Sequence, residues 1–107
     1  MKISVLGTDY DLVELERGDD TRIEESDGIC DDSVKEITPA KIERDKDSKT
    51  DLGRVRQKIL RHEIVLAFLC ESGLAENSDW AQDEEMVDWI AIQGPKIYRA
   101  GQEAGAV

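Results

Sequence analysis

The spacing of the hydrophobic residues near the N-terminus is typical of strands. Apolar and polar positions nearly alternate on both sides of the turn-forming segment Gly7-Thr8-Asp9. The apolar members are Ile3, Val5, Tyr10, Leu12, Val13 and Leu15. A period of two puts every second side chain on the same face of a strand, so this segment predicts a hairpin with one buried face.

A further set of strand and turn signals follows. Residues 17–20 and the pair Asp27-Gly28 have the composition of turns. After Gly28, residues 29–37 predict another strand, with Val34 and Ile37 as its apolar members. Pro39 ends that strand because proline has no backbone N–H to donate to a ladder. Residues 41–51 are nearly all charged and predict a solvated loop.

From residue 52 the hydrophobic period becomes that of a helix. Apolar side chains and the histidine recur at intervals of four and three residues: Val55, Ile59, His62, Leu66 and Leu69. This stripe predicts an amphipathic helix over residues 52–73. Thr50 or Asp51 is the expected N-cap, and Gly73 is the expected stop.

A second helix is predicted over residues 79–100. The polar segment Asn77-Ser78-Asp79 can cap it, and the helix continues past Gly94-Pro95 with a kink. The last residues, 101–107, are expected to form a tail without regular order. The large aromatic side chains of this half are expected in the core: Phe68, Trp80 and Trp89.

Strands followed by helices, without strand–helix alternation, predict an α+β fold. We expect a small, mostly antiparallel N-terminal sheet that packs on two helices. The sheet residues, 1–40, cannot bury their apolar face without those helices. The chain of 107 residues is expected to form one domain over residues 1–107.

Charge and cysteine content narrow the function classes. The chain has 14 Lys and Arg against 25 Asp and Glu, a net charge of −11. That sign opposes binding to nucleic acid and to anionic membranes. No apolar run approaches the roughly 20 residues of a membrane span, and the N-terminus has no signal-peptide pattern. Two cysteines, Cys30 and Cys70, are too few for a disulfide framework, so a cytoplasmic chain is expected.

The most informative chemistry surrounds the single histidine. His62 and Glu63 are adjacent in the middle of the first predicted helix. In the zinc-binding pattern H-E-x-x-H, two histidines one helical turn apart hold the metal, and the glutamate activates a water. The second histidine position is Leu66 here. On the second helix, Glu84 and Asp88 are spaced four apart, as a third ligand and a carboxylate that orients the first histidine would be.

Two segments carry a resemblance to a known family. Residues 60–74 and 84–91 look like small phage- and prophage-encoded metallopeptidases of the gluzincin (zincin) group, in which the first segment reads HEIVHAFLxESGL. The resemblance implies an α+β zincin core, zinc as the cofactor and hydrolysis of peptide bonds. It also implies roles for four residues of this chain: His62 as first zinc ligand, Glu63 as general base, Glu84 as third ligand and Asp88 as the partner of His62.

The chain departs from that family at two positions. Leu66 has no lone pair to offer a metal, and Gly94 stands where a larger apolar residue is usual before the proline. Catalytic zinc has three protein ligands, so a site with His62 and Glu84 alone is expected to bind zinc weakly or not at all. The prediction is therefore a phage-related, metallopeptidase-like protein with a degenerate metal site and weak or no peptide hydrolysis.

Three alternatives remain open from the sequence. The chain could be an acidic protein–protein interaction module without catalysis, since most of its acid excess lies in the first half. A metal could be retained if Cys30 or Asp88 served as the third ligand. Glu84 and Glu85 could also be first-turn acids that complement the dipole of a helix. A peptide or protein is the expected substrate or partner in the first two cases.

Overall fold

The N-terminal segment forms the predicted hairpin. A computed structural model describes residues 1–14, 28–39 and 52–107, so the expectations for Leu15, the turns at 17–20 and 27, the loop 41–51 and the cap at Thr50 or Asp51 lie outside the described residues. Strand β1 (Lys2–Val5) pairs antiparallel with β2 (Thr8–Leu12). The turn is Leu6-Gly7, with φ of 52° and 86°, rather than the predicted residues 7–9. Two successive residues with positive φ match the twist of a tight hairpin.

The predicted single strand over residues 29–37 is wrong, because the segment is a second hairpin. Strand β3 (Gly28–Asp31) pairs antiparallel with β4 (Glu36–Pro39). Gly28 belongs to the strand and not to a turn. Asp31 Oδ1 accepts hydrogen bonds from the backbone N–H and the hydroxyl of Ser33, at 3.1 and 2.5 Å. Such local side-chain bonds compete with a continuing ladder, so they favour the turn here.

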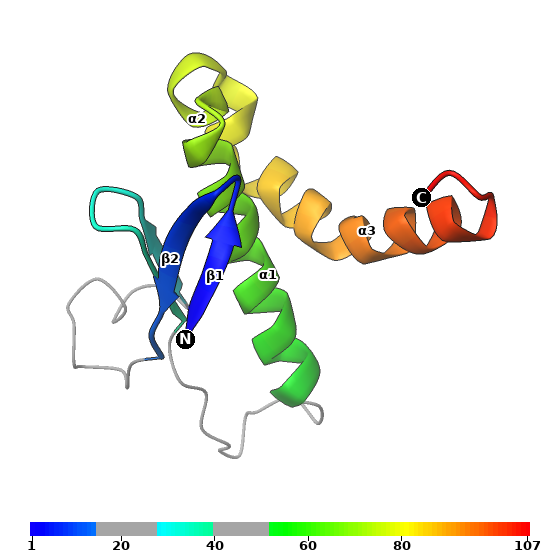
Figure 1. The fold of residues 1–107 in the computed structure, drawn as a ribbon, viewed down its shortest axis with the longest axis horizontal. Coiled ribbons are helices and arrows are strands. Elements are labelled where there is room, and N and C mark those ends of the chain that lie inside the picture. Colours follow the sequence, from blue (N-terminus) through cyan, green and yellow to red (C-terminus); the bar gives the residue numbers. More distant parts are fainter. Residues whose placement is uncertain (15–27, 40–51) are drawn as a thin grey trace.

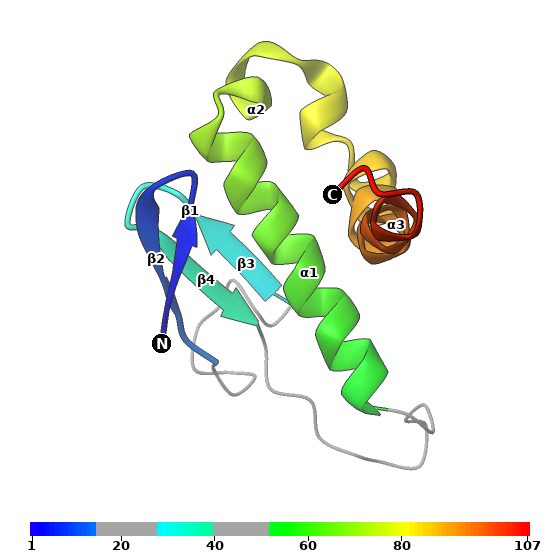
Figure 2. The same ribbon diagram turned by 45° about the vertical axis from the view of Figure 1, so that its right-hand side comes forward.

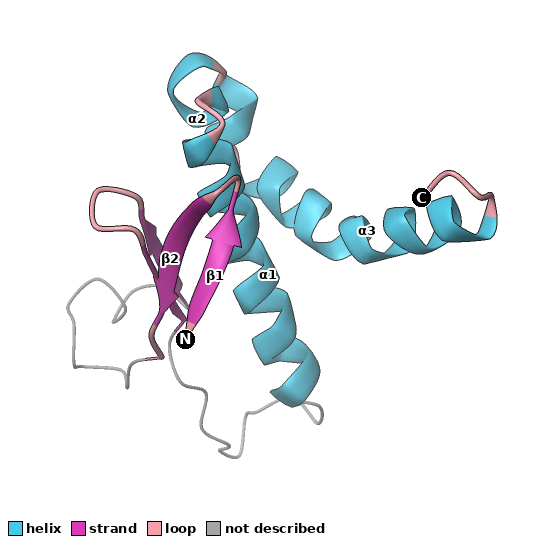
Figure 3. Cartoon of the chain, viewed as in Figure 1, coloured by secondary structure: helices cyan, strands magenta, loops and turns pink. Residues whose placement is uncertain are grey.

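The four strands form one mixed sheet in the order β1-β2-β4-β3. Its central pair, β2 and β4, is parallel, and the two hairpin pairs are antiparallel. Figures 1 and 3 show the strands gathered on one side of the molecule and the helices on the other. The predicted α+β class and the mostly antiparallel character of the sheet are confirmed.

Helix α1 (Leu52–Glu71) packs across the sheet, as Figure 2 shows. Its Ala67 joins Val5, Tyr10 and Ile37 of the sheet in one buried cluster. The helix ends two residues before Gly73, which has a φ of 84°, so the predicted glycine stop is confirmed.

The second predicted helix is divided and shifted. A short helix α2 (Leu74–Asn77) and a 3₁₀ turn η2 (Asp79–Gln82) precede helix α3 (Glu84–Glu103). Asp83, and not a residue of 77–79, caps α3 by accepting from the N–H groups of Glu85 and Met86. The helix passes through Pro95 and extends to Glu103. The expected unordered tail after residue 100 is therefore wrong for residues 101–103.

Helix α3 leaves the rest of the molecule along much of its length (Figure 1). Only Val87 and Ala91 of this helix are buried. The expectation that the aromatic residues lie in the core is wrong: Phe68 is 40%, Trp80 43% and Trp89 54% exposed. Among the helices of the described segments, none combines the length and the apolar character that a bilayer crossing requires.

Candidate functional site

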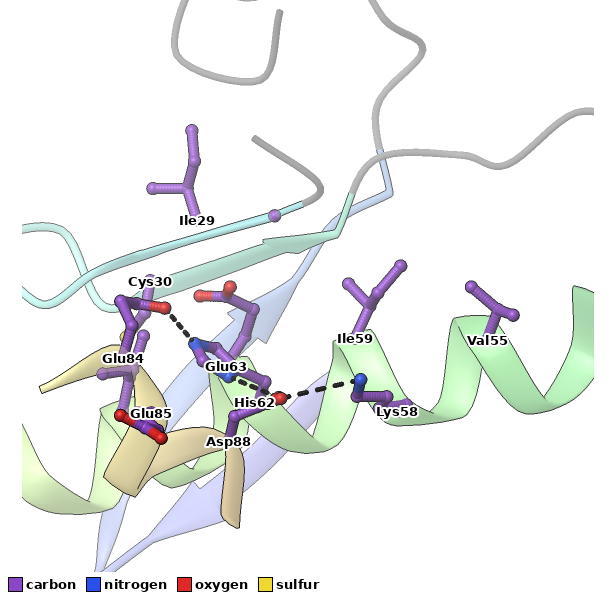
Figure 4. A pocket seen from close by; sticks show the side chains of 12 residues that line it. Ile29, Cys30, Val55, Lys58, Ile59, His62, Glu63, Glu84, Glu85 and Asp88 are labelled. Atoms are coloured by element: carbon purple, nitrogen blue, oxygen red, sulfur yellow. Dashed lines mark hydrogen bonds and ion pairs between the residues drawn. The ribbon is translucent and has the colours of Figure 1, made fainter. Parts of the chain in front are cut away.

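A cavity of about 810 Å³ lies between α1, the start of α3 and strand β3 (Figure 4). It contains the residues to which the sequence gave a role in a metal site, together with apolar side chains of α1 and β3. The lining residues are Gly28, Ile29, Cys30, Val55, Lys58, Ile59, His62, Glu63, Leu66, Glu84, Glu85 and Asp88.

His62 lies between the two carboxylates of α3 that the spacing had put on one helix face. Its Nε2 is 2.9 Å from Glu84 Oε2, and its Nδ1 is 3.3 Å from Asp88 Oδ1. The imidazole is nearly buried, with 14% of its side chain exposed. A neutral ring has a single N–H, so both contacts are hydrogen bonds at once only when the ring carries a proton on each nitrogen.

Two basic residues of α1 complete this contact between the helices, and neither was predicted. Lys58 Nζ is 3.6 Å from Asp88 Oδ2, on the side of that carboxylate that His62 does not use. Arg61 Nε donates to the carbonyl oxygen of Ala91, at 2.9 Å. The sequence could have indicated the position of Lys58, since Lys58 is four residues before His62 and therefore on the same face of the helix.

Glu63 lines the same cavity, and its side chain points from α1 toward the sheet rather than toward α3 (Figure 4). Glu63 is 5% exposed, and its Oε2 has no hydrogen-bond partner among the described residues. Burial raises the pKa of Glu63 to about 7; the charge of His62 opposes this shift and that of Glu84 adds to it. Burial of a carboxylate with one unpartnered oxygen is costly, so the neutral acid is favoured over a wider pH range than for an exposed glutamate.

Gly28 of strand β3 leaves the space that Glu63 occupies. A β-carbon on Gly28 would lie 3.1 Å from Glu63 Cγ and 3.3 Å from Oε1. The sequence suggested a turn at this glycine, and only the packing of β3 on α1 reveals this contact.

Leu66 lines the cavity one helical turn after His62, where it contributes only hydrocarbon. Cys30 also lines it, and burial is the main reason why the pKa of its thiol is raised to about 12. Cys30 and Cys70 are both free thiols. In the described segments, no group of three or more His, Cys, Asp and Glu side chains is arranged to hold a metal ion.

Comparison of the whole chain with protein families, with curated proteins and with solved structures finds no match.

Proposed function

We propose that this chain is a metallopeptidase-like protein of the phage and prophage gluzincin type, whose metal site has lost one ligand. Peptides bind in its cavity and are hydrolysed weakly or not at all. One observation carries the proposal: His62 is held between Glu84 and Asp88, while Leu66 lines the same cavity one turn further along α1. The two free cysteines support action in the cytoplasm.

The contacts of His62 agree with the roles that the resemblance implies. A histidine that binds zinc through one ring nitrogen usually donates from the other to a carboxylate, which fixes the ring orientation. Asp88 is next to Nδ1, and Glu84 is next to Nε2, the nitrogen that would face a metal. Glu63 is on the same helix and lines the same cavity, as a general base would.

The residues of the cavity do not fit a catalytic zinc ion. Such an ion takes three protein ligands and one water. His62 Nε2 and Glu84 Oε2 are close enough to share an ion, at 2.9 Å, but Leu66 brings no donor to the third position. The raised pKa of the Cys30 thiol makes its thiolate, the form that binds metal, scarce near neutral pH.

The test is to restore the missing ligand. Zinc affinity is measured by competition with a chromophoric chelator for the wild-type chain and for Leu66→His, Leu66→Gln and Leu66→His/Glu84→Gln. We expect Leu66→His to bind zinc more than about tenfold more tightly than the wild type, a gain of about 1.4 kcal/mol. Leu66→Gln controls for the loss of the apolar side chain. The ligand assignment is wrong if Leu66→His binds no better, or if Glu84→Gln leaves its gain unchanged.

A second candidate is a protein–protein interaction module without catalysis. Its support is one exposed apolar face of α3, on which the helical spacing places Met86, Trp89 and Ile97, which are 43%, 54% and 58% exposed. Apolar groups gathered on a surface often mark contact sites. A stoichiometric partner that co-purifies with the wild-type chain, and is lost with Trp89→Ser/Ile97→Ser, supports this candidate. A partner retained by that variant counts against this surface.

A further inference from the structure

The charges in the cavity are not balanced by its own basic groups. Among the residues that the structure describes, four carboxyl groups line it: Glu63, Glu84, Glu85 and Asp88. The basic side chains in this described lining are Lys58 and His62, and both contact Asp88. His62 also contacts Glu84. The cavity therefore has an acidic surplus on the side of Glu63 and Glu84, in a chain whose net charge is −11.

Glu63 is the member of this group with a buried oxygen that no donor reaches within the described segments. Only 5% of Glu63 is exposed, and its Oε2 has no hydrogen-bond partner in the described part of the chain. Buried polar atoms in folded proteins nearly always have a partner, and an orphan at a cavity often marks a missing ligand. The group that would satisfy this oxygen is a donor, and a cationic one also relieves the repulsion between Glu63 and Glu84.

The remaining walls of the cavity are hydrocarbon. Ile29 of β3 and Val55, Ile59 and Leu66 of α1 line it. A metal ion or a small polar ion makes no use of these side chains. A ligand that combines a charged nitrogen with an apolar stem uses both parts, because the stem is removed from water while the nitrogen meets the carboxylates.

We propose that the cavity binds a primary ammonium group of a peptide, with the nitrogen between Glu63 and Glu84 and its aliphatic stem along Ile59 and Leu66. In this arrangement Leu66, which removes a metal ligand, supplies part of the wall for the stem. The cavity volume of about 810 Å³ accommodates a lysine side chain together with adjacent peptide. The inference rests on the proposed function only in taking a peptide as the ligand, and it requires no metal.

The ammonium could be a lysine side chain or the N-terminus of a peptide, and the probes separate the two. Fluorescent alanine peptides are prepared in three forms: acetylated with a central lysine, acetylated with a central norleucine, and with a free N-terminus and norleucine. Norleucine keeps an unbranched aliphatic stem and removes the charge. Affinities are measured by fluorescence anisotropy with the full chain in zinc-free buffer containing a chelator.

We expect one of the two ammonium-bearing peptides to bind about tenfold to a hundredfold more tightly than the acetylated norleucine peptide, the usual range for a hydrogen bond to a charged group. Glu63→Gln and Glu84→Gln should each remove most of that preference. Glu84 is 77% exposed, so its variant tests the idea even if Glu63→Gln alters the fold. The matched control is Glu76→Gln, which removes an exposed carboxylate on α2.

Equal binding of all three peptides, or an unchanged preference in Glu84→Gln, overturns the inference. Binding that is lost equally in Glu76→Gln also overturns it, because the effect would then be one of overall charge. A gain of zinc affinity in Leu66→His does not bear on these outcomes, so the failure of this inference and the failure of the proposed metal-site origin are distinguishable.

Discussion

Gly28 and Glu63 are in contact across the interface between strand β3 and helix α1, and the absence of a side chain on the glycine is what admits the carboxyl group. A β-carbon at Gly28 would stand 3.1 Å from Glu63 Cγ. That separation is shorter than ordinary van der Waals contact, so a larger residue there requires the Glu63 side chain or the strand to shift by a few tenths of an ångström. The position of the buried acid therefore depends on a residue 35 positions earlier in the chain.

Gly28→Ala is expected to destabilise the protein by about 1 kcal/mol. In a strand, replacing glycine by alanine raises the free energy of unfolding by about 0.5–1 kcal/mol, because alanine leaves the unfolded chain less conformational freedom. Crowding of a packed interface lowers it by about 1–3 kcal/mol. Urea unfolding measures the difference. The matched control is Gly94→Ala in α3, where a β-carbon meets nothing within 4 Å and helix propensity predicts a gain of up to about 1 kcal/mol. A stabilised Gly28→Ala would show that Glu63 moves aside freely.

Glu63 is expected to make stability fall as the pH rises from acid to neutral. Its pKa is about 7 in the folded chain against 4.5 for the ordinary group, so between these values the folded state holds a proton that the unfolded state has released. Ionisation of Glu63 therefore does not affect the free energy of unfolding below pH 4.5, and it lowers that free energy progressively until the pH passes 7. The full difference is on the order of 3 kcal/mol.

Chemical unfolding of the wild type and of Glu63→Gln across this pH range measures that cost. The glutamine variant should become the more stable of the two as the pH rises. Leu66→Met changes the same cavity without a titrating group, so its difference from the wild type should stay constant with pH. Parallel pH profiles for the wild type and Glu63→Gln would contradict the burial argument.

Tyr10→Phe is expected to weaken the attachment of the sheet to the end of α1. The Tyr10 hydroxyl donates to Glu71 Oε1 at 2.8 Å, and Lys35 donates to the same oxygen at 2.5 Å. These two bonds, that of Lys35 first, hold the pKa of Glu71 below its usual value, and burial of Tyr10 raises the pKa of its phenol. Because Glu71 has a lowered pKa, its contribution to stability is present above the ordinary pKa of glutamate and is lost as the pH falls.

Removal of one buried hydroxyl should cost about 1 kcal/mol in the free energy of unfolding at neutral pH. Tyr98→Phe is the control, since Tyr98 is 55% exposed on α3 and its change should stay within about 0.5 kcal/mol. Equal effects of the two substitutions would mean that the Tyr10–Glu71 bond contributes nothing to the packing of β2 on α1.

Asp88→Asn is expected to weaken zinc binding in the Leu66→His background by about tenfold to a hundredfold, the usual effect of removing a carboxylate that orients a histidine ligand. Asp88 accepts at Nδ1 of His62, 3.3 Å away, and so fixes the direction of Nε2. Chelator competition measures the loss, with Glu76→Gln as a control for net charge. An unchanged affinity would show that Lys58 and the packing of α1 hold the ring without Asp88.

Several features were readable from the sequence because they depend on neighbours within one element. The alternation around residues 3–12 predicted the first hairpin, and the 4-3 spacing from Val55 to Leu69 predicted α1. The stop at Gly73 followed from the conformational freedom of glycine at positive φ. The spacing of Glu84 and Asp88 put both on one face of a helix, and they do meet His62.

The sequence did not show where a strand would be interrupted or which of several polar residues would cap a helix. The strand predicted over residues 29–37 is interrupted after Asp31, which still pairs with Glu36 of β4, because the Asp31 side chain accepts hydrogen bonds from Ser33 and so favours a turn. The cap of α3 is Asp83, although three polar residues earlier in the chain were equally able to cap a helix. A composition rule ranks such residues alike, and the packing of Ala81 and Val87 against Leu69 favours one of them.

The sequence by itself determined the α+β class, the long helix and the residues from which a site could be built, because periodicity and spacing act within a few turns or strand residues. Only the tertiary structure decided what surrounds those residues. It brought Lys58 to Asp88, left Glu63 Oε2 without a donor from the described part of the chain and set Gly28 against the same side chain. These relationships join elements that are distant in the chain, and burial and close packing, which fix them, have no signature in local sequence.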